Sequence, residues 1–150
     1  NALAFSKERE QFGRPIAEFQ GLQWMLADMS VQLEAARALL HKAALSAGHN
    51  GSPFPDATLA AQGKIFTSEM ALKVTTDALQ VFGARGYSRN YPMERLARDA
   101  RMFTIGGGTA QILRTVVASR ILGSKLPQTR DGFTKLAESA SARTILQAAE

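Results

Sequence analysis

The glycine triplet Gly106-Gly107-Gly108, followed by Thr109, has the residue types best suited to chemistry in this sequence. Three glycines remove every side chain, so a ligand or another backbone can contact the main chain, and a positive φ carries no steric cost. Thr109 stands where a helix N-cap is expected, and the free N–H groups at a helix start favour anions or polarised carbonyls. The triplet predicts a cofactor-facing turn, although a tight helix–helix connection explains it equally well.

The sequence gives little support for a metal site or for a nucleophilic catalytic residue. His41 and His49 are the only histidines, they lie eight residues apart, and the chain has no cysteine. A protein metal site needs three or four ligands, and no Ser-His-Asp arrangement can be argued. Asp28 and Glu34 lie six residues apart, so they do not stack as the carboxylates of a di-metal bundle do. We therefore expect no metal site.

The net charge is +5, with one denser basic zone. An excess of positive charge can favour binding to nucleic acid, to an anionic membrane surface or to a phosphorylated ligand. A solvated face with partial ion pairing explains the zone as well as a surface that meets phosphates does. Its members are Arg85, Arg89, Arg95, Arg98, Arg101 and Arg114, with Glu94 and Asp99 among them.

The elements that position these residues fit one domain of 150 residues. A chain of this length buries ~70% of its unfolded surface. The sequence has no run of about 18 apolar residues, so no membrane span is expected. The lack of cysteine is consistent with a reducing compartment, and the lack of an initiator methionine suggests a fragment or a processed chain.

Hydrophobic spacing predicts helices throughout and no strand. A helix end over residues 2–10 stops at Gly13 and Pro15, and a long helix begins at Glu18. A second long helix begins after Asp56, an N-cap candidate, and ends at Gly83. The predicted buried face of the first long helix consists of Leu22, Leu26, Met29, Leu33, Ala36 and Leu40.

Two shorter helices follow, one opened by Pro92 and one over residues 109–122. Residues 125–130 are interpreted as a linker, and residues 133–149 as a short extra helix with a weak apolar face. The expected fold class is all-α. It consists of an antiparallel four-helix bundle over residues 1–124, with two long central helices, and a partly helical C-terminal extension over residues 125–150.

A series of ordered motifs runs from the N-terminus to about residue 124. They are Glu8-Arg9-Glu10-Gln11-Phe12-Gly13, Gln80-Val81-Phe82-Gly83, Tyr91-Pro92-Met93-Glu94-Arg95 and Gly108-Thr109-Ala110-Gln111-Ile112. In this order they resemble the C-terminal helical domain of the acyl-CoA dehydrogenase family. The resemblance implies a flavoprotein that binds FAD and acts on an acyl-CoA thioester.

The resemblance also implies which residues contact FAD, much of it held by a neighbouring subunit. Arg9 would face the pyrophosphate, for which a guanidinium is well suited. Ala84 stands where the family has a second glycine, so its methyl group leaves less room for a ligand to approach the backbone there. The implied FAD contacts are Arg9, Gln11, Phe12, Gln20, Gln80, Val81, Phe82, Gly83, Ala84, Thr109 and Gln111. Gly106 and Gly107 would line the substrate side.

Gly107 is the main departure from the family pattern. Many members carry a glutamate at this position, which removes the α-proton of the thioester while hydride leaves the β-carbon. Glycine cannot take a proton. Either a segment upstream of Asn1 supplies the base, or the protein is a non-dehydrogenating relative, and this segment holds no catalytic residue. A glycine here would also enlarge the pocket, which suits a branched acyl chain.

The expected whole protein is an FAD-dependent acyl-CoA dehydrogenase, and this segment alone would be inactive. The implied partners are an acyl-CoA substrate, the protein's own N-terminal and middle domains, further copies in a dimer or tetramer, and an electron-transfer acceptor protein. The expected location is the cytoplasm, or the mitochondrial matrix in a eukaryote. The alternatives are a DNA-binding relative, since the isoelectric point is near 10.0, and a pure assembly domain.

Overall fold

The structure is a computed structural model that describes residues 1–124, 127 and 130–147. Its residues fall into two compact units that meet between Val116 and Val117. The elements are α1 (Ala2–Glu8), β1 (Glu10–Gln11), β2 (Arg14–Pro15), the 3-10 turn η1 (Ile16–Glu18), α2 (Gln20–Leu45), the 3-10 turn η2 (His49–Gly51), α3 (Ala57–Phe82), α4 (Ala84–Tyr87), α5 (Met93–Phe103), α6 (Ala110–Ile121) and α7 (Arg130–Gln147).

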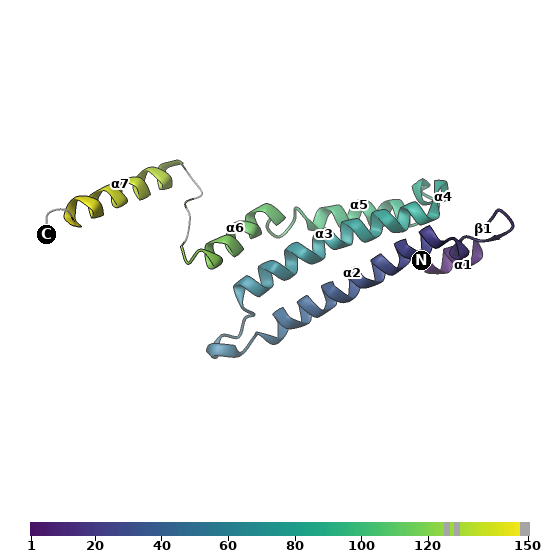
Figure 1. Ribbon diagram of the computed structural model, residues 1–150, viewed down its shortest axis with the longest axis horizontal. Helices are drawn as coiled ribbons and strands as arrows, with labels where there is room; N and C mark the ends of the chain where they lie inside the picture. Colours follow the sequence, from purple (N-terminus) through teal and green to yellow (C-terminus); the bar gives the residue numbers. More distant parts are fainter. Residues whose placement is uncertain (125–126, 128–129, 148–150) are drawn as a thin grey trace. The chain divides into compact units, whose positions relative to one another are not determined.

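The first unit is built on α2 and α3, which run antiparallel and pack against each other, as Figure 1 shows. Small residues allow the close approach: Ala36 and Ala43 of α2 and Ala61 and Gly63 of α3 are buried. A methyl group added at Gly63 would already touch the Leu40 side chain, at 3.6 Å. The seam is therefore narrow.

This narrow seam leaves part of the predicted α2 stripe uncovered. Met29 and Ala36 are buried as expected, but Leu33 is 43% exposed and Leu40 is 47% exposed. The face predicted for these two leucines is correct in period and wrong in burial. The physical reason is that a helix with one close neighbour covers a narrower stripe than a helix held between two neighbours.

Local signals set the ends of α3 as predicted. Asp56 caps the start, where its Oδ1 accepts a hydrogen bond of 2.9 Å from the Leu59 N–H. Gly83 ends the helix with a φ of +59°. Directly after it, Gly86 is packed so tightly that an added methyl would lie 2.5 Å from the Leu79 carbonyl oxygen.

An aromatic core closes the end of the first unit where α1, the end of α3 and the start of α5 meet. The rings of Phe5 and Phe82 stack with centroids 4.1 Å apart, and Tyr91 meets Phe82 edge-on at 6.0 Å. Met93, the first residue of α5, is only 2% exposed. This core holds the N-terminal segment against the C-terminal end of α3.

The expectation of no strand is wrong at one place. Glu10–Gln11 pairs antiparallel with Arg14–Pro15 in a two-residue hairpin. The turn consists of Phe12 and Gly13, which both have positive φ, as a type I′ turn requires. Strands of two residues are too short to produce an alternating pattern, which is why periodicity missed them. The all-α class is otherwise confirmed.

The second unit contains α7, whose first residue, Arg130, lies three residues before the predicted start. Residues 125–126 and 128–129 of the predicted linker, and residues 148–149 of the predicted helix, lie outside the described part of the chain. Among the described helices, none combines the length and the apolar character that crossing a membrane requires.

Candidate functional site

A hollow of about 250 Å³ brings together two predicted segments that are far apart in sequence. From the N-terminal segment, Arg9 and Gln11 line it. From the end of α3, the run from Val81 to Ala84 lines it, and Phe5 and Ile16 complete the apolar part of the wall. The structure therefore collects much of the predicted dinucleotide site in one place.

Main-chain hydrogen bonds fix Arg9 at this hollow. Its N–H donates to the Phe5 carbonyl at 2.8 Å, which ends α1, and its carbonyl accepts from the Ile16 N–H at 2.8 Å. Arg85, the second residue of α4, also lines this hollow. Sequence reasoning placed Arg85 in the basic zone and did not assign it to the site.

Five of the predicted FAD contacts do not line the hollow: Phe12, Gln20, Gln80, Thr109 and Gln111. Gln80 is exposed, and its carbonyl accepts from the Gly83 N–H at 3.0 Å, which forms the turn that ends α3. Gln20 is exposed at the first residue of α2. Neither side chain is among those that line the hollow.

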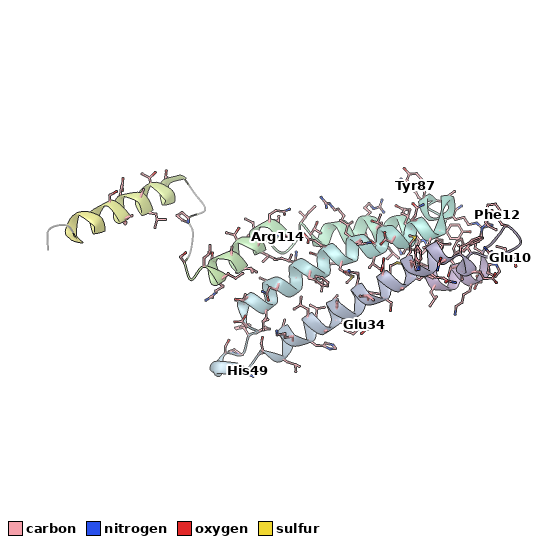
Figure 2. All side chains as sticks on the ribbon, viewed as in Figure 1. Glu10, Phe12, Glu34, His49, Tyr87 and Arg114 are labelled. Atoms are coloured by element: carbon pink, nitrogen blue, oxygen red, sulfur yellow. The ribbon has the colours of Figure 1, made fainter. Side chains whose placement is uncertain are left out.

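Phe12 projects from the tip of the hairpin, as Figure 2 shows. Its side chain is 91% exposed and its φ is +55°, a conformation that is costly for any residue except glycine. The ring meets Phe19 edge-on at 6.1 Å, and the Arg14 guanidinium lies 4.3 Å from the Phe19 centroid. An exposed ring on a strained backbone is consistent with the predicted contact role of Phe12.

The predicted glycine turn joins α5 to α6. Gly107 and Gly108 have φ values of +68° and +88°, so the turn does need glycine. Thr109 caps α6 as expected, with its Oγ1 accepting from the Ile112 N–H at 3.2 Å. Gln111, two residues later, is exposed.

Lys64 of α3 holds this turn, which sequence reasoning did not anticipate. Its Nζ donates to the carbonyl oxygens of Gly106 at 2.9 Å and Gly108 at 3.0 Å, and also to that of Phe103. One ammonium therefore binds three main-chain acceptors, one at the end of α5 and two in the glycine triplet. The partners lie 39 to 44 residues apart in sequence, so no local pattern signals them.

Space around the triplet differs from residue to residue. A Cβ at Gly107 would meet no atom within 4 Å, whereas one at Gly106 would lie 2.7 Å from the Met102 sulfur. A side chain at position 107 would therefore enter open space, at the cost of a positive φ. The sequence resemblance predicted that this position corresponds to the catalytic glutamate of many family members.

The basic zone is partly neutralised. Arg98 lies 3.6 Å from Glu94 within α5, and Arg114 of α6 lies 2.8 Å from Glu69 of α3. The Arg114 hydrogen bond lowers the pKa of the Glu69 carboxyl below its usual range. Within the described residues, no group of three or more His, Cys, Asp or Glu side chains could hold a metal ion.

Comparisons with known proteins agree with the helical fold. Residues 1–122 match the family model for the acyl-CoA dehydrogenase C-terminal domain. The 3-sulfinopropanoyl-CoA desulfinase of Advenella mimigardefordensis is 67% identical over 92% of this chain and 33% of its own length. The structure of butyryl-CoA dehydrogenase from Megasphaera elsdenii superposes with a TM-score of 0.75 and 43% identity, covering 81% of this chain and 31% of that one.

The FAD complex of PigA is also similar, with a TM-score of 0.72 and 29% identity over 81% of this chain and 31% of that chain. The chain thus spans about a third of the length of the relatives it matches.

Proposed function

Because the chain belongs to the acyl-CoA dehydrogenase family, of which it forms the C-terminal helical domain, we propose that it completes the flavin and substrate sites of a larger enzyme. We propose further that this enzyme desulfinates 3-sulfinopropanoyl-CoA. The similarity to a desulfinase at 67% identity supports the substrate, against 43% for the butyryl-CoA dehydrogenase.

The residues present fit an FAD dinucleotide. The hollow beside Arg9 combines two guanidinium groups with the exposed main chain of Gly83, which suits a diphosphate. Phe12 offers an exposed ring, and Thr109 and Gln111 stand at the start of α6. When bound, the flavin would supply the electron-transfer chemistry, while these residues bind and orient it. Gln20 and Gln80 are proposed as outer contacts.

The observation that carries the proposed reaction is Gly107. A dehydrogenase must remove an α-proton, and this position offers no acceptor. The net desulfination reaction needs no proton acceptor at this position. The carbon–sulfur bond breaks, the β-carbon gains a proton, and the sulfur gains the oxygen of water and leaves as hydrogen sulfite. Carbon is reduced as sulfur is oxidised, so the overall reaction consumes water and needs no outside electron acceptor.

The test uses the full-length protein with 3-sulfinopropanoyl-CoA. We expect sulfite and propanoyl-CoA to form in equal amounts without any added electron acceptor. Butyryl-CoA with an artificial acceptor serves as the comparison and should react slowly or not at all. Rapid reduction of the acceptor by butyryl-CoA, without sulfite release from the sulfinate, would contradict the proposal.

Straight-chain or branched-chain dehydrogenation is the second candidate. It is favoured by the similarity to butyryl-CoA dehydrogenase, and it requires a base from another part of the protein and an electron-transfer acceptor protein. Gly107→Glu tests the distinction, because the new carboxylate would enter open space. If the substrate lies beside the triplet, the variant should gain dehydrogenation of butyryl-CoA, although glutamate at a φ of +68° costs about 1 kcal/mol.

DNA binding is a weaker candidate, because Arg98 and Arg114 of the basic zone already have carboxylate partners. The proposed partners are the acyl-CoA thioester, the protein's own N-terminal and middle domains, and further copies in a dimer or tetramer. Exposed apolar residues of α2 and α6, such as Val31 at 66% and Ile112 at 54%, support assembly. The proposed location is the cytoplasm, or the mitochondrial matrix in a eukaryote.

A further inference from the structure

The glycine triplet has no side chains to pack, so its position depends on main-chain contacts. Hydrogen bonds from the Gly106 N–H and the Ala110 N–H close the two ends of the turn, at 2.8 and 3.0 Å. Between these ends, the carbonyl oxygens of Gly106 and Gly108 accept from Lys64 Nζ at 2.9 and 3.0 Å. Within the described part of the chain, the middle of the turn is therefore held to α3 through one ammonium group.

The ammonium of Lys64 has no donor left for a ligand. It carries three N–H groups, and the carbonyl oxygens of Phe103, Gly106 and Gly108 supply three acceptors. Phe103 is the last residue of α5, and a cation is favoured at the C-terminal end of a helix. Lys64 therefore acts on the turn, and a sulfinate or a phosphate would have to displace one of these contacts.

The peptide groups that Lys64 binds direct their N–H groups to the other side of the turn. In a trans peptide the C=O and the N–H point in opposite directions, and the described residues contain no cis peptide. The Gly106 carbonyl shares its peptide with the Gly107 N–H, and the Gly108 carbonyl shares its peptide with the Thr109 N–H. These two N–H groups point away from the ammonium, and a side chain at Gly107 would enter open space. We call this side the outer face of the turn.

We propose that Lys64 is a positioning residue for the desulfination reaction, because it fixes the outer face of the turn relative to the reacting end of the thioester. The inference rests on the proposed function, since the family resemblance places the substrate beside Gly106 and Gly107. A misplacement of about 1 Å near a reacting group can lower a rate by roughly 100-fold. Loss of the ammonium should therefore lower the turnover of bound substrate.

FAD binding is the readout that separates a positioning role from general damage. The hollow that contains Arg9 and Val81 supplies many of the predicted FAD contacts. Val81 follows Lys64 by 17 residues on α3, which is about 25 Å along an α-helix. Thr109 and Gln111 adjoin the turn, so a small effect is expected. A change confined to the turn should leave FAD affinity within about threefold of the wild type.

The test compares full-length, FAD-loaded protein carrying Lys64→Met, Lys64→Arg, Lys73→Met or Glu69→Gln, with 3-sulfinopropanoyl-CoA as the substrate. Sulfite release is measured per bound FAD, well below the unfolding temperature of each variant. We expect K64M to lower kcat by about tenfold to 100-fold with KM within about threefold, since a misplaced turn acts on the transition state. K64R should lose less, because it keeps the charge but does not reproduce the geometry of an ammonium.

Two of these variants are controls that separate the turn from the helices around it. Lys73 lies nine residues further along α3 and pairs with Asp77. Glu69→Gln breaks the ion pair that joins α3 to Arg114 of α6, and it leaves the three acceptors of Lys64 in place. K73M and E69Q should both keep kcat within about twofold. An equal loss in E69Q would show that the attachment of α6 sets the rate, and it would overturn the proposal.

A kcat of K64M within about twofold of the wild type also overturns the positioning role. A rise in KM with kcat unchanged does the same, because it marks the loss of uniform binding. If K64M does not load FAD, K64R decides, and a wild-type kcat in K64R overturns the proposal. A wild-type protein that releases no sulfite overturns the proposed function instead. The same variants are then compared on butyryl-CoA with an artificial acceptor, where K64M should show the same loss of kcat.

Discussion

Replacing Lys64 with methionine is the sharpest test of how the glycine turn is held. The ammonium donates to three carbonyl oxygens, one at the end of α5 and two in the turn, and the methionine side chain keeps an unbranched apolar stem while removing every donor. Hydrogen bonds to charged groups contribute about 1.5–3 kcal/mol each in favourable cases. The contributions of three hydrogen bonds that share one partly exposed ammonium are not additive. We therefore expect a loss of about 2 kcal/mol in the local stability of the turn.

The assay is hydrogen–deuterium exchange of the peptide that spans the turn, measured in the full-length protein. Two amides report directly: the Gly106 N–H donates to the Met102 carbonyl, and the Ala110 N–H donates to the Thr104 carbonyl. A loss of about 2 kcal/mol makes local opening roughly 30-fold more frequent, and exchange should accelerate by the same factor.

Lys73→Met is the matched control, because this lysine lies nine residues further along the same helix and pairs with Asp77 at 2.6 Å. It should leave exchange of the turn unchanged. Lys64→Arg should recover part of the protection, since it keeps the charge and changes the geometry. If K64M left the exchange of both reporting amides within about twofold of the wild type, the proposed tether would be refuted.

Four other changes have clear expected outcomes in the full-length protein. Gly86→Ala should destabilise it by about 3 kcal/mol, because the added methyl would lie 2.5 Å from a carbonyl oxygen of α3. Gly21→Ala, with nothing within 4 Å, should be neutral or stabilising in thermal unfolding. Phe12→Gly removes the strain of a φ of +55°, so stability should hold or rise by up to about 1 kcal/mol while FAD affinity falls; a parallel loss of stability would contradict this. The pKa of Glu69 is lowered by Arg114, so the pair stabilises the fold above the usual carboxyl range, and that contribution is lost as the pH falls. Glu69→Gln should therefore lose less thermal stability than the wild type between about pH 5 and pH 3, by a small margin because both side chains are about half exposed.

Sequence patterns predicted best the features that depend on neighbouring residues. Asp56, Gly83 and Thr109 act where they were expected, because a cap or a helix stop is decided within one turn of the chain. The period of α2 was also predicted correctly. The burial of this face was predicted only in part. Leu33 and Leu40 would need a second neighbouring helix to cover them, and residue spacing does not show how many neighbours a helix has.

Residue spacing alone did not predict the candidate site. Arg9 and Val81 line one hollow although 72 positions separate them, and the family resemblance suggested that meeting before the structure placed it. The resemblance assigned no role to Lys64 or Arg85, and both make contacts with distant segments. A lysine in mid-helix or an arginine after a turn has no local signature that distinguishes it from an ordinary surface charge.

Lys64 binds the glycine turn through its main chain alone, so none of its contacts involves a side chain at position 107. A substitution there leaves all three carbonyl acceptors in place and puts a new group into vacant space. Scaffold and reactivity are therefore separable at this point. One codon change could exchange a proton acceptor for an inert surface, which gives a simple route by which enzymes with a common fold and cofactor diverge to break different bonds.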